Sequence, residues 1–300
     1  MKSNVENNIF SEVKTGMSEK QLRLILLTHG GVEMALERLL ALDCAQVVGI
    51  FIETDTTRRV GHREKVKRSI RYDGYGATVG KFARALFGRR AADDASATES
   101  NHDLLRKIAE AHHVPIHFVS NYHSEDSRAL MRSADADLGV ILGTNILKES
   151  VFKIPRLGSI NVHQGLAPYY RGCPAVFWEL FNGEREVGLT VHFVESKVDT
   201  GDIVLQQTAP LEYDYSFGTD FDAFITEYRK GLIGRCAQLV ADAVQALAEG
   251  TASPRPQDTS LGKRYRLPIK KEKDELKRRL RQRRRASAGR LVTERIGGRS

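Results

Sequence analysis

The chain has 300 residues, of which 41% are hydrophobic and 28% are charged, and its formal net charge is +8. This hydrophobic share is enough for a sizeable core and excludes a wholly disordered chain. No apolar run approaches the roughly 18 residues of a membrane span, and the N-terminus has no apolar signal core, so we expect neither membrane insertion nor secretion. Three widely spaced cysteines fit a reducing, cytoplasmic location and argue against a disulfide framework.

The positive charge is concentrated in two segments. Residues 263–300 contain 16 lysines and arginines against 4 acidic residues, and residues 58–90 contain 11 against 2. Residues 1–262 therefore sum to a net charge of −4. Such an asymmetry bears on partners or solubility rather than on fold.

Short apolar runs alternate with segments of helical spacing along the chain. The runs predict strands at residues 22–27, 46–52, 116–119, 138–142, 159–163, 189–194 and, as a short edge strand, 203–207. Helical spacing is found at residues 32–42, 102–111, 125–134, 174–182 and 220–249, the last as one long or two shorter helices. This alternation predicts a Rossmann-like α/β fold with a doubly wound, mostly parallel sheet.

Composition predicts the limits of the domains. We expect a leader at residues 1–20, a single α/β domain at 21–253 with a basic insertion at about 58–100, and a linker and basic tail at 254–300. Within the tail, Asp274 and Glu275 precede Arg278 and Arg279 by four positions, which predicts a solvated basic helix at 270–285.

Three polar side chains follow the predicted strands in a pattern that suits chemistry. Asn161 and His163 alternate at the carboxyl end of the strand at 159–163, where open α/β sheets bind ligands, and Asp199 lies in a Thr-Gly turn 36 residues after His163. Each residue alone is more often a local hydrogen-bonding group or a turn residue. Together, an oxyanion donor, a proton relay and a proton acceptor suit acyl-type transfer to an amine.

The intervening loop carries a family resemblance. Residues 165–172 read GLAPYYRG, which resembles the Ser-Leu-Leu-Pro-x-x-Arg-Gly segment of the folate-dependent formyltransferases. The Asn-x-His pair, this loop and the Asp-x-Gly turn come in the family's order and approximate spacing. The resemblance implies transfer of the formyl group of N10-formyltetrahydrofolate to a primary amine. In that reaction Asn161 and His163 stabilise the oxyanion, while Asp199 accepts the amine proton, directly or through water, and orients His163.

The resemblance also implies where the substrates bind. The folate is expected between two loops, largely on their backbone, at Thr144, Asn145, Ile146, Leu147, Glu195 and Val198. Gly30 and Arg171 are expected to bind the acceptor. We expect no metal site, since Pro115 breaks the helix that would align His113 and His117 as ligands.

The sequence departs from the family pattern in several places. Gly165 replaces the loop serine, and Ala167 replaces a loop leucine. After the first strand, Thr-His-Gly-Gly-Val at 28–32 replaces the Gly-x-Gly-Ser-Asn phosphate cradle of the purine-pathway members, so a purine-pathway role is not expected. Only 42 residues follow Asp258, so we expect no C-terminal barrel of the kind found in the tRNA-directed members.

Three functions therefore stay open. The first, which we favour, uses a small amine or a nucleotide-linked amino sugar as the acceptor. In the second, RNA is the acceptor and the two basic segments bind it. The third is a non-catalytic module that binds nucleic acid through its tail; it gives no reason to retain Asn161, His163 and Asp199, and the tail has only Tyr265 for base stacking. The sequence sets no oligomeric state.

Overall fold

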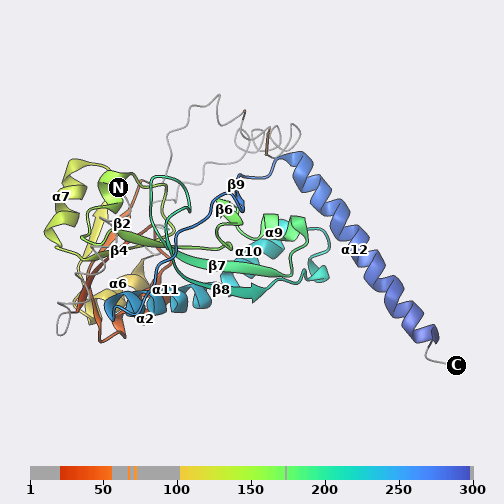
Figure 1. The fold of residues 1–300 in the computed structure, drawn as a ribbon, viewed down its shortest axis with the longest axis horizontal. Coiled ribbons are helices and arrows are strands. Elements are labelled where there is room, and N and C mark those ends of the chain that lie inside the picture. Colours follow the sequence, from red (N-terminus) through yellow and green to blue (C-terminus); the bar gives the residue numbers. More distant parts are fainter. Residues whose placement is uncertain (1–20, 56–66, 68–70, 73–101, 173, 298–300) are drawn as a thin grey trace.

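The computed structural model describes residues 21–55, 67, 71–72, 102–172 and 174–297, with side chains to residue 285. The predicted leader and nearly all of the predicted basic insertion lie outside the described residues. Within them, a seven-stranded sheet has the strand order β3-β2-β1-β4-β5-β7-β8 (Figure 1). Its strands are β1 (Leu22–Thr28), β2 (Ala45–Glu53), β3 (Ile116–Val119), β4 (Leu138–Leu142), β5 (Ser159–His163), β7 (Glu186–Phe193) and β8 (Ile203–Pro210).

The sheet is parallel from β3 to β5 and antiparallel where β7 joins β5 and β8 joins β7. Strands β1 and β4 are buried along almost their whole length. This burial follows from the continuous apolar runs, because a parallel strand is covered on both faces. The predicted doubly wound, mostly parallel α/β sheet is confirmed, and β8 is an edge strand as expected.

Helices cover both faces of the sheet. Leu24 and Leu26 of β1 point into the core shared with α2 (Glu33–Leu40), α6 (Asp103–Ala111) and α11 (Ile233–Ala248). The alternate residues, Ile25 and Leu27, point into the core beneath α7 (Glu125–Ser133) and α8 (Glu149–Phe152). The period of two along a strand thus divides one apolar run between two cores.

The segment predicted as one or two helices at 220–249 forms two. Helix α10 (Phe221–Gly231) ends at a glycine, and α11 begins after Leu232. Asp220 caps α10 by accepting a hydrogen bond from the backbone amide of Ala223 at 3.1 Å. A 3₁₀ turn, η1 (Tyr215–Phe217), precedes them. No helix within the described ranges is long and apolar enough to cross a membrane.

The C-terminal segment packs onto the domain, which corrects the prediction of a solvated tail. Strand β9 (Lys263–Tyr265) pairs in parallel with β6 (Tyr170–Gly172), and helix α12 (Lys270–Gly297) follows. Leu276 and Leu280 of α12 are 0% and 1% exposed in the main core. Only the far end of α12 extends away from the other elements (Figure 1).

An arginine fixes α12 against α9 (Phe177–Asn182). Arg279 donates a 2.7 Å hydrogen bond to the carbonyl of Phe181, and its guanidinium lies 4.1 Å from the centre of the Phe181 ring. Glu275 pairs with both Arg278 and Arg279, whereas Asp274 pairs with Lys270 instead of the predicted Arg278. The ion pairs therefore stabilise α12 as a helix, and the burial of Leu276 and Leu280 holds it against the domain.

Candidate active site

The carboxyl end of β5 places the predicted polar side chains. Asn161 and His163 point to the same side of the strand because they are two residues apart. The antiparallel pairing sets Asn161 opposite His192 and His163 opposite Thr190. The Thr190 hydroxyl donates to the Gly165 carbonyl at 2.8 Å and accepts from the Ala167 amide at 3.2 Å. Strand β7 therefore fixes the start of the loop at 165–172.

His163 is buried between Asp199 and that loop. Its Nδ1 atom lies 3.5 Å from Oδ2 of Asp199, and its Nε2 atom lies 2.8 Å from the carbonyl of Tyr170. Since a carbonyl can only accept, the hydrogen of the neutral ring is on Nε2. Burial lowers the pKa of His163, and the opposing Asp199 charge only partly offsets it. The resting imidazole is therefore neutral, with Nδ1 facing the carboxylate.

Asp199 occupies a constrained turn. Its φ of +54° is in the left-handed region, which is uncommon for residues other than glycine and is found at functional sites. The turn also requires Gly201, since a Cβ there would lie 2.0 Å from the Phe193 carbonyl. Burial acts to raise the pKa of Asp199, but His192, His163 and the Gly172 amide outweigh it and lower the pKa to about 2. Asp199 is thus ionised throughout the neutral range.

His192 is a site residue that the sequence did not reveal. It is 2% exposed, its Nδ1 atom lies 2.7 Å from the Phe193 carbonyl, and its Nε2 atom lies 3.5 Å from Oδ1 of Asp199. Asp199 is therefore flanked by two imidazoles, one on each carboxylate oxygen. A histidine within the largely apolar run at 189–194 was the available signal, but only the strand register places it opposite Asn161.

A small hollow of about 150 Å³ lies beside these groups, on the side of Asn161 and Asp199. All six residues predicted to bind the folate line this hollow, together with His192: Thr144, Asn145, Ile146, Leu147, Glu195 and Val198. Ile141 and Val194 add apolar surface. The hollow thus combines apolar side chains with polar and charged ones, Asn161 and Asp199 among them.

A larger hollow of about 490 Å³ lies on the side of His163. Gly30, which is expected to bind the acceptor, lines this hollow, and its φ of +112° is one that glycine alone adopts readily. Most of the remaining lining is apolar or backbone, and Arg229 is its one arginine or lysine among the described residues. Arg229 donates a 2.7 Å hydrogen bond to the Gln164 side chain.

Arg171, which the sequence predicts to bind the acceptor, lines neither of these two hollows. Its side chain is 8% exposed and donates to the carbonyls of Pro168, Thr259 and Gly262 at 3.1, 3.1 and 3.4 Å. A guanidinium has five N–H donors. Here three hydrogen bonds from it join the loop at 165–172 to the segment before β9. Arg171 is therefore a structural residue in this chain.

No candidate metal site is found among the described residues. Across the residues that the structure describes, no group of three or more histidine, cysteine, aspartate and glutamate side chains could hold a metal ion. Asp199 and its two imidazoles are instead arranged as a chain of proton-binding groups. Such a chain can take up and hold a proton beside a reacting amine.

The fold is a Rossmann-like α/β domain, and an amide, two imidazoles and a carboxylate meet at the carboxyl end of its sheet. Residues 89–233 match the family model described as formyl transferase. This region of the chain is therefore similar to the formyl transferases.

Curated relatives resemble the chain in sequence, and a solved structure resembles it in fold. The chain is 31% identical over 160 residues to methionyl-tRNA formyltransferase of Azobacteroides pseudotrichonymphae, covering 53% of this chain and 47% of that protein. It is 33% identical over 158 residues to the enzyme of that name from Geobacter metallireducens, covering 52% and 48%. The chain therefore spans about half the length of the curated relatives it matches. Glycinamide ribonucleotide transformylase 1 from Symbiobacterium toebii shares the fold, with a TM-score of 0.52 at 18% identity over 81% of this chain and 100% of that one.

Proposed function

We propose that the chain is a cytoplasmic N-formyltransferase that moves the formyl group of N10-formyltetrahydrofolate, the donor used by this family, to a primary amine. One observation carries the proposal. Asn161 and Asp199 line the smaller hollow, His163 lines the larger hollow, and His163 and Asp199 face each other at 3.5 Å. The polar groups thus stand between two separate hollows, as a transfer from a donor to an acceptor requires.

The smaller hollow is the donor site in this proposal. The loop at 144–147 and the loop at 195–198 would hold the pterin, mainly through their backbone groups. The donor supplies a formyl group that is already bonded to nitrogen and is ready for acyl transfer. Asn161 would donate its amide hydrogens to the formyl oxygen as that oxygen gains negative charge.

His163 and Asp199 would accept the proton that the attacking amine loses. Asp199 is ionised, so it accepts the proton that the attacking amine loses. Nδ1 of His163 carries no hydrogen and faces that carboxylate, so it can share the proton. Nε2 of His163 donates its hydrogen to the Tyr170 carbonyl, so His163 could donate to the oxyanion only after this hydrogen bond breaks. In this conformation, the donation to the oxyanion is therefore assigned to Asn161 rather than to both residues.

The acceptor would occupy the larger hollow. Arg229 favours an amine whose molecule also carries an anionic group, such as the phosphates of a nucleotide-linked amino sugar. Methionyl-tRNA is the second candidate, favoured by the names of the curated relatives. Both acceptors carry phosphate, so charge alone does not separate them.

The test is a formyl-transfer assay with N10-formyltetrahydrofolate and two acceptor classes, nucleotide-linked amino sugars and methionyl-tRNA. We expect formylation of at least one of the sugars, and a sharp loss of that activity in Asn161→Ala. Folinic acid, a stable reduced folate, should raise the melting temperature of the wild type by mass action. Formylation of the RNA alone would select the second candidate. A flat melting temperature at millimolar folate, with no formylated product, would overturn the proposal.

A further inference from the structure

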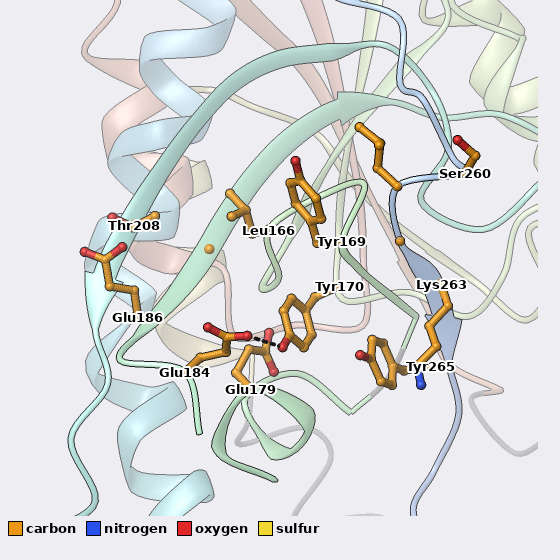
Figure 2. A pocket seen from close by; sticks show the side chains of 13 residues that line it. Leu166, Tyr169, Tyr170, Glu179, Glu184, Glu186, Thr208, Ser260, Lys263 and Tyr265 are labelled. Carbon is orange, nitrogen blue, oxygen red and sulfur yellow. Dashed lines mark hydrogen bonds between the residues drawn. The ribbon is translucent and has the colours of Figure 1, made fainter. Parts of the chain in front are cut away.

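A third hollow, of about 590 Å³, shares no lining residue with the two hollows beside the catalytic groups. Leu166, Tyr169 and Tyr170 of the catalytic loop form one side of it, and the segment at 260–265 adds a second (Figure 2). The side chain of Tyr170 lines this hollow, whereas its carbonyl holds His163. The loop thus separates this third hollow from the catalytic histidine.

Three carboxylates line the third hollow. Glu179 comes from α9, Glu184 from the turn that follows, and Glu186 from the start of β7; Figure 2 shows them on one side, with Lys263 on the other. Among the residues that the structure describes, no lysine or arginine forms an ion pair with any of the three glutamates. The Lys263 ammonium instead lies 4.8 Å from the centre of the Tyr265 ring.

Glu179 is the unusual member of this set, because it is only 2% exposed. Burial raises its pKa to about 7, and the charge of Glu184 adds to that effect. An ionised carboxylate is costly to bury without a positive partner. A cation entering the hollow would supply that partner for Glu179, while Glu184 and Glu186 lie exposed nearer the solvent.

Tyrosines and a leucine supply the apolar part of the remaining walls, beside the polar Thr208 and Ser260. Tyr170 and Tyr265 stack with an angle of 7° between their rings, and the Asn182 amide donates to both hydroxyl groups at 2.9 and 3.2 Å. Tyr169 and Leu261 add exposed apolar surface, at 46% and 56% exposure. Aromatic faces attract both planar groups and cations. This fixed wall of tyrosines therefore suits a flat or apolar body attached to a positive charge.

We propose that the third hollow is a binding site for a small organic cation, an ammonium or guanidinium group carried on a planar or apolar body. Its positive group contacts the carboxylates of Glu179, Glu184 and Glu186. Its body lies against the tyrosines and Leu261. The charge preference is the opposite of that of the acceptor hollow, where Arg229 favours an anionic group, so the two sites select different molecules.

Benzamidine is a suitable probe, and the protein contains its own reporter. Trp178 is the only tryptophan of the chain, and its ring lies 5.0 Å from that of Tyr265. We expect a saturable change in tryptophan fluorescence with benzamidine. Benzyl alcohol and benzoate, which have similar bodies without the positive charge, should bind at least tenfold more weakly. The titration needs neither folate nor acceptor, so its outcome is independent of the proposed transfer reaction.

The variant Glu184→Gln/Glu186→Gln tests the carboxylates without disturbing the core, because both side chains are exposed. It should weaken benzamidine binding at least tenfold. Glu37→Gln, an exposed glutamate on α2 outside the hollow, is the matched control and should bind as the wild type does. Benzoate binding as tightly as benzamidine, no saturable response, or equal binding by the double variant and the control would each overturn the proposal.

Discussion

The candidate active site, at the carboxyl end of β5 and here called the catalytic edge, and the docked C-terminal segment (β9 and α12) are held in place by different forces. At the catalytic edge, Asp199 lies in a left-handed turn between two buried imidazoles. In the C-terminal segment, Leu276 and Leu280 of α12 fill the main core, and the carbonyl of Arg266 accepts a 2.8 Å hydrogen bond from Trp178. Hydrogen bonds and charges therefore fix the polar side chains around Asp199, whereas apolar burial holds α12 against the domain. Substitutions in the two regions should therefore fail in different ways.

The largest effect on stability is expected in α12. Replacing a buried leucine by alanine costs about 2–5 kcal/mol, from lost burial and the cavity left behind. Leu276→Ala/Leu280→Ala should lower the free energy of unfolding by at least that much, measured by urea denaturation. Gln282→Ala, an exposed position on the same helix, is the control and should change little. A double variant with the midpoint of the wild type would mean that α12 does not dock.

At the catalytic edge, Asn161→Ala should lower turnover by about 10²–10³-fold, or roughly 2.7–4 kcal/mol in the barrier, as expected for loss of an oxyanion donor. The urea midpoint should stay close to that of the wild type. His163→Ala and Asp199→Ala should also lower turnover steeply. Combining two of these changes should cost much less than the sum, because the groups act together. Any of the three single variants with near-normal turnover would remove that residue from the mechanism.

Arg171 and Arg229 form a matched pair that separates structure from recognition. Arg171→Met removes charge-assisted hydrogen bonds to backbone carbonyls, each worth roughly 1.5–3 kcal/mol, so the urea midpoint should fall. The Michaelis constant for the acceptor should change little. Arg229→Met should do the reverse, with a raised Michaelis constant for an anionic acceptor and a nearly unchanged midpoint. If Arg171→Met raised the Michaelis constant at unchanged stability, the original assignment of Arg171 to acceptor binding would be restored.

The smallest expected effect is the pH dependence that Asp199 contributes. Its pKa of about 2 in the folded protein is below the ordinary value of 3.8, so ionised Asp199 stabilises the fold above about pH 4. That contribution, about 2 kcal/mol, should disappear as the pH falls from about 4 to 2. The difference in unfolding free energy between the wild type and Asp199→Asn, measured across this range, should shrink accordingly. A constant difference would show that the charge of Asp199 is not stabilised by its neighbours.

Much of the catalytic domain could be predicted from the sequence because its signals are local. The apolar runs placed β1 and β4 within a residue of their observed bounds, since a parallel strand covered on both faces is apolar on both. The predicted bounds of β5, which carries polar residues on one side, also match those observed. Alternation along β5 put Asn161 and His163 on one side. The two loops expected to bind the folate were located by family resemblance, and the structure brings them together around a single hollow.

The features that the sequence did not give depend on contacts between distant segments. His192 reaches Asp199 because β7 pairs with β5 in one register, and the sequence of a strand does not state its partner. Leu276 and Leu280 are four residues apart and so share one helix face, but the surrounding charges concealed that short apolar stripe. Local periodicity and strand-end chemistry determined the sheet and the Asn161–His163 pair. Tertiary structure alone decided that the basic tail docks, that Arg171 joins two segments, and that residues 166–170, 179–188 and 260–265 enclose a third hollow. Each of these features needs side chains far apart in the chain to meet.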